Sequence, residues 1–282
     1  MIDFSLPAAH GRPRVMGVLN ITPDSFSDGG TLYVEGSLNL DEVLRRADNM
    51  LAEEVDIFDV GGESTRPGAK PLAEQEELER VMPAVEALAS RFNVPISIDT
   101  SSPVVMSQAV AAGAMMVNDV RALSQSGALE TMSQSGAAVC LMHLQSRPET
   151  MQQAPVYQDV AVEVQAFLQD RVRACVEAGI EKHRLLIDPG FGFGKNLAHN
   201  IALLQALPQL VAEGYPVLVG LSRKRMVGEI TGRQVDERVH GSVALALLAA
   251  QRGAAMIRVH DVGATIDVLK IWAAIEPEQS GA

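Results

Sequence analysis

The chain has 282 residues, of which 47 % are hydrophobic and 21 % are charged, and its formal net charge at pH 7 is −12. This composition is ordinary for a globular protein with a large core, and the acidic balance argues against nucleic-acid partners, which need a basic face. No apolar stretch approaches the ~18 residues of a membrane span, and because the N-terminus shows no basic-then-apolar signal, we expect a cytoplasmic protein with no membrane partner.

Eight short apolar runs recur along the chain, and each ends in a polar residue. They cover residues 14–20, 56–62, 95–100, 115–120, 137–143, 184–190, 216–222 and 256–260. Their near-continuous apolar character predicts strands that are buried on both faces, as in a parallel sheet. Cys140 lies within the fifth run and Cys175 on the apolar face of a helical pattern, so we expect two buried small side chains and no disulfide.

Helical patterns lie between these strands. They cover about residues 38–53, 76–91, 103–112, 126–135, 159–178, 198–212, 236–252 and 262–275. In residues 76–91 and 159–178 the apolar positions follow the i, i+3, i+4, i+7 spacing of one buried stripe. Pro83 is expected to kink the first of these two helices.

Eightfold alternation of strand and helix predicts an α/β fold of the (β/α)8 TIM-barrel type, with residues 1–282 forming a single domain. The alternative is an open doubly wound sheet. The strand count favours the barrel, and so does the lack of a GxGxxG turn after the first strand.

Polar side chains stand at the end of every predicted strand. The set includes Asn20, Asp99, Asn118, His143, Asp188, Ser222, Lys224, Arg258 and His260. Each one alone has a structural explanation, such as a helix cap, a turn or a hydrogen-bonded core histidine. In a barrel, however, the C-terminal strand ends meet at one mouth, and buried polar groups need partners. We therefore predict a ligand site at this mouth.

Two kinds of group share that mouth. Asp99, Asn118 and Asp188 supply carboxylates and an amide, which suit the edge of a flat heterocycle with several N–H donors. The second kind comes from strands that are neighbours around a barrel: Lys224, Arg258, His260 and Asn20. Three potential cations and an amide suit a phosphate or diphosphate, and Asn20 together with substrate oxygens suits Mg²⁺.

The loops after the first two strands, "TPDSFSDGG" and "ESTRPG", are rich in Gly, Pro, Ser and Asp. They could be ordinary connections. Gly29, Gly30 and Gly68 would also permit a closing lid, and Arg66 offers a clamp for a carboxylate. The later loop "GFGFGKN" adds two aromatic residues but lacks the Ser or Thr of a phosphate-binding GxxxxGK motif.

Taken together, the ordered segments "MGVLNITPDSFSDGG", "DVGGESTRPG", "SIDT", "NDV", "DPGFGFGKN", "SRK" and "RVHDV" make the chain resemble the dihydropteroate synthase family of the bacterial folate pathway. The resemblance spans nearly the whole chain. It implies a (β/α)8 barrel, commonly a homodimer. The implied reaction is a transferase reaction that joins 4-aminobenzoate to (7,8-dihydropterin-6-yl)methyl diphosphate with Mg²⁺, giving dihydropteroate and diphosphate. Sulfonamides would compete with 4-aminobenzoate.

The resemblance also implies a role for each matching position. The pterin would be bound by Asp99, Asn118, Val120, Met142, Asp188, Phe193, Gly220 and Lys224. The 4-aminobenzoate site would comprise Phe26, Thr65, Arg66, Pro67, Phe191 and Ser222. Diphosphate would be bound by Asn20, Arg66, Arg258 and His260, with Asn20 on the metal. The catalytic residues would be Asp99, Lys224, Arg258 and His260.

The chemistry that follows is an SN1-like displacement. The basic groups and Mg²⁺ would stabilise the leaving diphosphate, and the acidic groups would favour a pterin cation that the amine of 4-aminobenzoate attacks. Three alternatives stay open: a pterin-dependent methyltransferase, a catalytically silent pterin-binding barrel, and a barrel for another phosphorylated metabolite.

Overall fold

The computed structural model describes residues 4, 8, 11–22, 33–34, 37–64, 72–145 and 155–276. All eight predicted strands are present within them. They are β1 (Arg14–Asn20), β4 (Ile57–Gly61), β5 (Ile96–Asp99), β6 (Met116–Asp119), β7 (Ala138–Met142), β8 (Leu185–Asp188), β9 (Leu218–Val219) and β10 (Met256–Val259). Two further short strands, β2 (Tyr33–Val34) and β3 (Ser37–Leu38), form a separate antiparallel pair.

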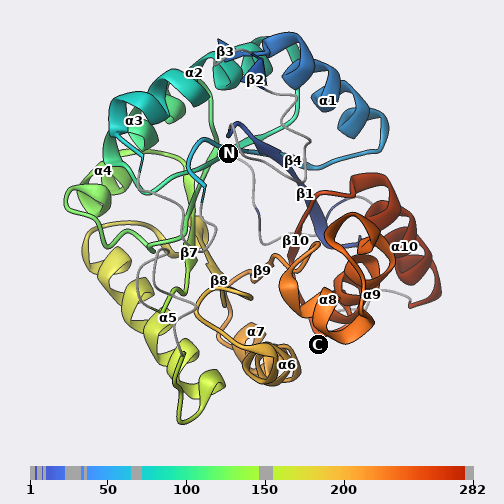
Figure 1. The fold of residues 1–282 in the computed structure, drawn as a ribbon. Coiled ribbons are helices and arrows are strands. Elements are labelled where there is room, and N and C mark those ends of the chain that lie inside the picture. Colours follow the sequence, from blue (N-terminus) through green and yellow to red (C-terminus); the bar gives the residue numbers. More distant parts are fainter. Residues whose placement is uncertain are drawn as a thin grey trace.

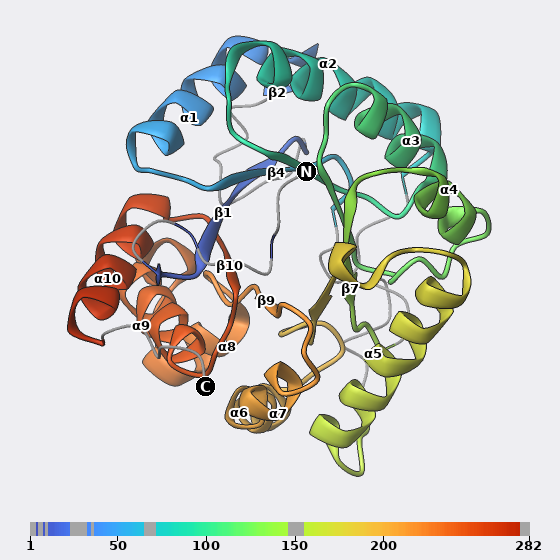
Figure 2. The ribbon, with the colours of Figure 1, turned by 180° about the vertical axis from the view of Figure 1, so that it is seen from behind.

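The eight strands form one parallel sheet in the order β8-β7-β6-β5-β4-β1-β10-β9. A parallel bridge between Ile187 and Val217 joins its two ends, and the Ile187 N–H donates to the Pro216 carbonyl at 3.0 Å. The sheet is therefore a closed barrel, as the alternation of strands and helices predicts. The helices form a ring around the strands (Figures 1 and 2).

The helical ring follows the predicted order with two departures. Its members are α1 (Leu40–Ala52), α2 (Glu74–Arg91), α3 (Pro103–Ala111), α4 (Ala128–Gln134), α5 (Val160–Glu177), α6 (Leu197–Gln205), α7 (Leu207–Val211), α8 (Arg225–Thr231), α9 (Val239–Ala250) and α10 (Val262–Ile275). The single helix predicted over 198–212 is two helices, because Pro208 lacks an N–H and is tolerated only in the first turn of α7. The sequence pattern also missed α8.

Two apolar layers hold the barrel together. The inner layer fills the barrel with the side chains of Met16, Ile57, Met116, Ala138, Cys140, Leu186, Leu218 and Met256, together with Phe4. The larger outer layer lies between the strands and the helices. Cys140 and Cys175 are both buried and unpaired, as predicted. None of the helices in the described residues is long and apolar enough to cross a membrane.

The inner layer is apolar only near the amino ends of the strands. Along β4, Ile57 belongs to the inner apolar layer, and Asp59 and Gly61 follow it at the period of two that keeps residues on one face of a strand. Along β5 and β6 the last inward positions are Asp99 and Asn118. The barrel therefore places a polar layer directly above an apolar floor, at its carboxyl end.

Candidate active site

Four strand ends form one row across the mouth of the barrel. Asn20 lies opposite Gly61, Gly61 opposite Asp99, and Asp99 opposite Asn118. Because Gly61 has no side chain, this row contains a gap: a Cβ atom there would lie 3.7 Å from Asp99 Oδ2 and 3.8 Å from Asn20 Oδ1. The Asn20 amide and the Asp99 carboxylate therefore face the same space.

The guanidinium of Arg258 lies between two carboxylates. Its Nε donates to Asp59 Oδ2 at 2.6 Å, and its Nη2 donates to Asp99 Oδ2 at 2.8 Å. Asp59 is completely buried, whereas 22 % of the Arg258 side chain is exposed toward the mouth. Within the described residues Nη1 has no acceptor, so Arg258 keeps donors for an anionic ligand.

Asp188 and Lys224 form the other side of the mouth. Asp188 Oδ1 accepts the Gly190 N–H at 2.7 Å. Burial raises the pKa of Asp188, and the positive charge of Lys224 is the largest effect that opposes the shift. Burial also lowers the pKa of Lys224 to about 8, against the attraction of Asp188. The two groups are therefore an oppositely charged pair whose ionisation depends on each other.

Lys224 is also held by the loop that follows Asp188. Its Nζ donates to the Phe191 carbonyl and lies 4.6 Å from the centre of the Phe193 ring, a cation–π contact. Gly220 separates Lys224 from Arg258, because a Cβ atom at Gly220 would lie 3.8 Å from Lys224 Nζ and 3.8 Å from Arg258 Cβ. Lys224 of the predicted pterin group and Arg258 of the predicted diphosphate group thus lie on either side of Gly220 at the mouth.

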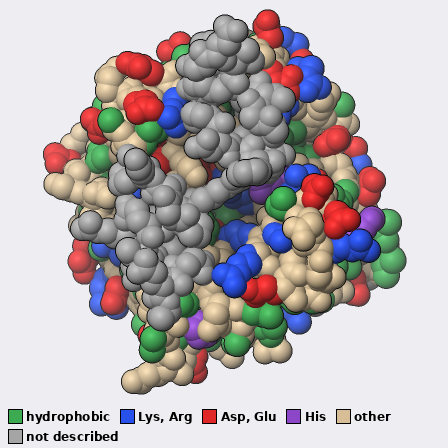
Figure 3. Space-filling view, in the orientation of Figure 1, with side chains coloured by type: hydrophobic (Ala, Val, Ile, Leu, Met, Phe, Trp, Pro, Cys, Tyr) green, Lys and Arg blue, Asp and Glu red, His purple; other side chains and the backbone are tan. Residues whose placement is uncertain are grey.

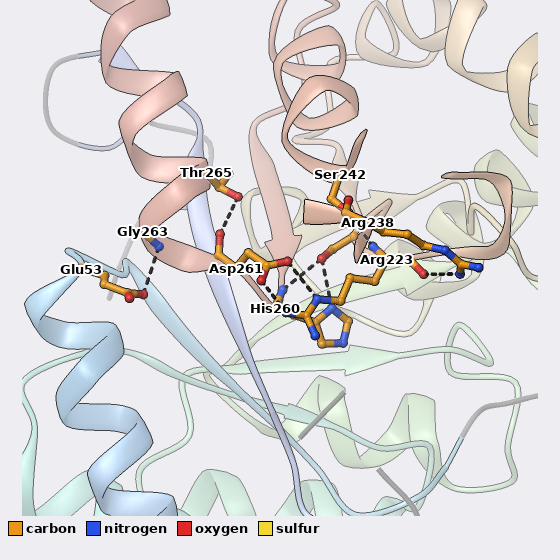
Figure 4. Close-up of polar contacts among 9 residues, drawn as sticks. Glu53, Arg223, Arg238, Ser242, His260, Asp261, Gly263 and Thr265 are labelled. Carbon is orange, nitrogen blue, oxygen red and sulfur yellow. Dashed lines mark hydrogen bonds and ion pairs between the residues drawn. The ribbon is translucent and has the colours of Figure 1, made fainter. Parts of the chain in front are cut away.

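His260 pairs with Ser222 at the same end of the barrel. The Ser222 Oγ lies 3.0 Å from His260 Nδ1 and accepts the His260 N–H at 3.2 Å. Next to them, Arg223 donates to Asp261 at 3.0 and 2.5 Å (Figure 4). Figure 3 shows Lys, Arg and His side chains gathered near the middle of one face of the molecule.

His260 is one of the three potential cations that the sequence offers, and its burial decides its charge. Burial, followed by the positive charges of Arg258 and Arg223, lowers the pKa of His260 to about 3. The imidazole is therefore neutral at neutral pH, and the cluster holds two cations rather than three. A neutral imidazole still supplies one donor and one acceptor.

The pKa of Asp99 is shifted upward, in the opposite direction to that of His260. Burial raises the pKa of Asp99, while the Arg258 guanidinium lowers it and the neighbouring Asp59 raises it further. Because Arg258 contacts both carboxylates, it offsets part of their mutual repulsion. A second positive charge placed beside Asp99 would meet a carboxylate that has little water to stabilise it.

The remaining predicted residues divide into three groups. Val120, Met142, Gly220 and Ser222 are buried at or just beyond the strand ends, where the prediction puts them. The ring of Phe191 is fully buried in the outer apolar layer, so the prediction that it contacts 4-aminobenzoate does not fit, and its carbonyl faces Lys224 instead. Phe26, Thr65, Arg66 and Pro67 lie outside the described residues.

Two polar residues of the site were not predicted. Asp59 lies inside β4 rather than at its end. The one sign in the sequence is that Asp59 stands two residues before Gly61, so that its side chain points into the barrel, where it contacts Arg258. Lys195 is buried beneath the 190–194 loop and contacts His143. A hydrogen-bonded core histidine is one of the two explanations that the sequence leaves open for His143. Neither residue belongs to the set of strand ends from which the site was inferred.

The donor set agrees with a metal held largely by a substrate. The described residues contain no group of three or more His, Cys, Asp or Glu that could hold an ion. The amide oxygen of Asn20 is a hard donor on the rim of the mouth, near Asp99. One or two protein oxygens plus phosphate oxygens are the usual environment of Mg²⁺.

Comparisons with known proteins agree with this geometry. Residues 16–260 match the family model described as "Pterin binding enzyme". The dihydropteroate synthase of Haemophilus influenzae is 51 % identical over 262 residues, covering 93 % of this chain and 94 % of that protein. The dihydropteroate synthase of Escherichia coli K12 is 49 % identical over 267 residues, covering 95 % and 92 %.

Solved structures give the same result. A Yersinia pestis dihydropteroate synthase with a sulfonamide drug complex superposes with a TM-score of 0.92 at 49 % identity, covering 98 % of both chains. Dihydropteroate synthase from Xanthomonas albilineans in complex with 7,8-dihydropteroate gives a TM-score of 0.84 at 47 % identity, covering 98 % and 97 %. The same enzyme with 4-aminobenzoic acid gives 0.87 at 51 % identity, covering 97 % and 95 %. The chain therefore belongs to the pterin-binding enzyme family, among the dihydropteroate synthases.

Proposed function

We propose that the chain catalyses the dihydropteroate synthase reaction of folate biosynthesis. It joins 4-aminobenzoate to (7,8-dihydropterin-6-yl)methyl diphosphate and releases 7,8-dihydropteroate and diphosphate. The observation that carries this proposal is the meeting of Asp99, Arg258 and Lys224 at one mouth, with Gly61 and Gly220 leaving space between them. The names and bound ligands of the related proteins support it.

The pterin binds against the acidic side of the mouth. Asn118 Oδ1 is buried and has no hydrogen-bond partner among the described residues, and an N–H group of a heterocycle would supply one. Asp188 and Lys224 add an acceptor and a donor for the same flat edge. The Phe193 ring, which already faces Lys224, borders the plane of the pterin.

Diphosphate binds against the basic side. Arg258 offers its Nη1 while Asp59 and Asp99 fix the orientation of the guanidinium. His260 adds a neutral donor, and Arg66 is a further diphosphate ligand. Asn20 would hold Mg²⁺ together with diphosphate oxygens, and the bound ion would offset the charge that develops on the leaving group.

The bond to diphosphate breaks before the new C–N bond is complete. Positive charge then spreads over the pterin beside Asp99 and Asp188. Because burial raises the pKa of both carboxyl groups, each carboxylate gains more from a nearby cation than an exposed one would. The neutral amine of 4-aminobenzoate attacks this cation, and the strongly acidic anilinium that forms releases its proton to the departing diphosphate or to water, so that proximity replaces a dedicated strong base.

The second substrate occupies the outer part of the mouth. Ser222, Thr65, Pro67 and Phe26 bind 4-aminobenzoate, and Arg66 binds its carboxylate. The loops after β1 and β4 close over the cation and exclude water, which would otherwise capture it. Sulfonamides compete for this same subsite.

Two properties complete the proposal. The chain acts as a homodimer, as enzymes of this family commonly do, and light scattering of the purified protein measures that mass. It works in the reducing cytoplasm, a setting that its two buried, unpaired cysteines support.

A coupled assay tests the proposed function. The purified chain receives both substrates with Mg²⁺ or with a chelator, and diphosphate and dihydropteroate are measured together. We expect equal amounts of the two products, dependent on both substrates and on Mg²⁺. A pterin-dependent methyltransferase would release no diphosphate, and a silent pterin-binding barrel would bind the pterin without forming either product.

A further inference from the structure

Lys195 is a buried lysine whose Nζ makes three short polar contacts. Its side chain is 2 % exposed. Nζ lies 2.9 Å from His143 Nδ1, 2.9 Å from the Gly190 carbonyl oxygen and 3.0 Å from the Phe193 carbonyl oxygen. An ammonium carries three N–H donors, whereas a neutral amine carries two. Both protonation states satisfy the three contacts, because the ammonium donates to all three, whereas the neutral amine donates to the two carbonyls and accepts from a His143 Nδ1–H. Burial lowers the pKa of Lys195 to about 7, against the attraction of Asp188.

The imidazole of His143 is in the form that this arrangement needs. Burial and then the positive charge of Lys195 lower the pKa of His143 to about 3, so the ring is neutral and its Nδ1 can accept. His143 lies directly after β7 and packs edge-on against Phe167 of α5, with ring centroids 4.9 Å apart. The His143 ring that Lys195 contacts is thus itself held between the barrel and α5.

The 190–194 loop adopts a backbone conformation that contacts from outside the loop must stabilise. Gly190, Gly192 and Gly194 all have left-handed backbone conformations, with φ values of +68°, +80° and +59°. A Cβ atom at Gly190 would lie 1.9 Å from the His143 carbonyl oxygen. The loop therefore turns sharply against the segment after β7, and its glycines gain no rigidity from side chains.

Lys195 closes this loop from below. It binds the carbonyl at the start of the loop, Gly190, and the carbonyl near its end, Phe193. Asn200 and Tyr157 support single points only: Asn200 Oδ1 accepts the Gly192 N–H at 2.7 Å, and Tyr157 donates to the Gly194 carbonyl at 3.0 Å. Among the described side chains that contact the loop here, Lys195 binds a carbonyl at each end, whereas Asp188 holds the Gly190 N–H alone.

The upper side of the same loop contacts Lys224. The Phe191 carbonyl accepts from Lys224 Nζ, and the Phe193 ring lies beneath that group. Both contacts come from residues that lie between, or at, the two carbonyls that Lys195 binds. We propose that Lys195 is a positioning residue for pterin binding: its buried amino group fixes the 190–194 loop in the shape that aims Lys224 at the pterin.

This inference rests on the proposed function, since it assigns Lys224 to the pterin. If Lys195 acts in this way, replacing it weakens binding of the pterin and leaves binding of 4-aminobenzoate unchanged. Loosening the loop weakens binding of the pterin, whereas the 4-aminobenzoate subsite draws on Ser222 and on the segment around Thr65, which the loop does not carry. A lysine that served only overall stability would lower the apparent kcat through the fraction of folded protein and would leave both KM values unchanged.

The experiment compares the unmodified 282-residue chain with Lys195→Met, Lys195→Gln and, as a matched control, Lys270→Met. Lys270 pairs with Glu54 on the exposed side of α10, away from the mouth. Calorimetry measures binding of the pterin alcohol, (7,8-dihydropterin-6-yl)methanol, and steady-state assays measure KM for each substrate. Thermal melts establish that each variant is folded at the assay temperature.

We expect Lys195→Met to weaken binding of the pterin alcohol roughly tenfold or more, with a parallel rise in KM for the pterin diphosphate. The KM for 4-aminobenzoate stays within about twofold. Lys195→Gln, which keeps two donors, falls between it and the wild type, and Lys270→Met matches the wild type.

Three results would overturn the inference: a folded Lys195 variant that binds the alcohol as the wild type does, an equal rise in both KM values, or failure of both Lys195 variants to fold. If the wild type itself neither bound the alcohol nor formed product, the proposed function would be wrong. That result differs from the three above, in which the wild type is active and only the role of Lys195 is wrong.

Discussion

Asp59 accepts the Nε–H of Arg258 at 2.6 Å inside the barrel, and no water-exposed atom of Asp59 remains. The contact joins β4 to β10 across the barrel interior. It fixes the guanidinium so that one edge meets the two carboxylates and the other faces the mouth. Arg258 is consequently oriented before any substrate arrives, which would reduce the entropy lost on binding of diphosphate at the proposed site.

Replacing Asp59 with Asn keeps the size of the side chain but removes its charge. Arg258 then loses a charge-assisted partner, and the Asp99 carboxylate alone orients it. We expect kcat/KM for the pterin diphosphate to fall roughly 10- to 100-fold, or about 1.4–2.7 kcal/mol, with the KM for 4-aminobenzoate little changed. Unchanged kinetics in a folded Asp59→Asn protein would show that Arg258 needs only one carboxylate.

Asp99 is expected to act on the reacting pterin itself. Asp99→Asn removes the negative charge that favours the developing cation while preserving an acceptor. We expect kcat at saturating substrates to fall about 100-fold or more, because the lost interaction is strongest in the transition state. An unchanged kcat would remove Asp99 from charge stabilisation, whatever its effect on binding.

Glu63 and Arg121 connect two loops beside the mouth. Arg121 donates to the two oxygens of Glu63 at 3.1 and 3.2 Å, and both side chains are largely buried. Since Glu63 stands two residues before Thr65, the pair holds the start of the proposed 4-aminobenzoate segment. We expect Arg121→Met and Glu63→Gln each to raise the KM for 4-aminobenzoate about three- to tenfold.

A double variant shows whether Arg121 and Glu63 act as a pair or independently. If the two residues act together, combining Arg121→Met with Glu63→Gln adds little to either change alone. Binding of the pterin alcohol serves as the internal control and stays within about twofold. Full additivity would mean that the two residues support the segment separately.

Glu77 gives the protein a pH-dependent stability that the site does not use. It is buried on α2 (4 % exposed), and one of its carboxyl oxygens has no hydrogen-bond partner. Burial raises its pKa from 4.5 to about 7. The folded state therefore binds a proton that the unfolded state releases, so the contribution of Glu77 to stability is complete below pH 4.5 and is lost as the pH rises to 7.

Glu77→Gln removes this titration. We expect the free energy of unfolding of the variant, relative to the wild type, to increase between pH 4.5 and 7 and then to level off, reaching about 1–3 kcal/mol. Urea unfolding at a series of pH values measures the difference. A difference that does not vary with pH would show that Glu77 titrates normally.

The sequence predicts the strands well because strands buried on both faces consist of apolar runs. The departures have local causes. Pro208 divides one predicted helix, and α8 is too short to show a periodic apolar stripe. Strand ends indicate Asp99, Asn118 and Asp188 because each carboxyl or amide group interrupts an apolar run.

The site residues that the sequence missed or misassigned depend on three-dimensional facts. Asp59 lies in the middle of β4 rather than at its end. Only the direction of its side chain, into the barrel, distinguishes it from a residue that caps a nearby element. In the glycine loop the backbone turns so sharply that Phe191 points into the outer core while Phe193 faces Lys224. The neutral state of His260 follows from burial beside Arg258 and Arg223, which spacing along the chain does not reveal.

The central claim is that the carboxyl-end mouth of the barrel performs the chemistry, and a pair of arginines tests it most directly. Arg258 contacts Asp59 at 2.6 Å at that mouth, and Arg12 contacts Asp56 at 2.6 Å at the opposite end, where β1 and β4 begin. We measure kcat/KM for the pterin diphosphate in Arg258→Met and Arg12→Met, each at a temperature at which it is folded. We expect a loss of roughly 1,000-fold for Arg258→Met and at most about threefold for Arg12→Met. Equal losses in the two variants would contradict the central claim.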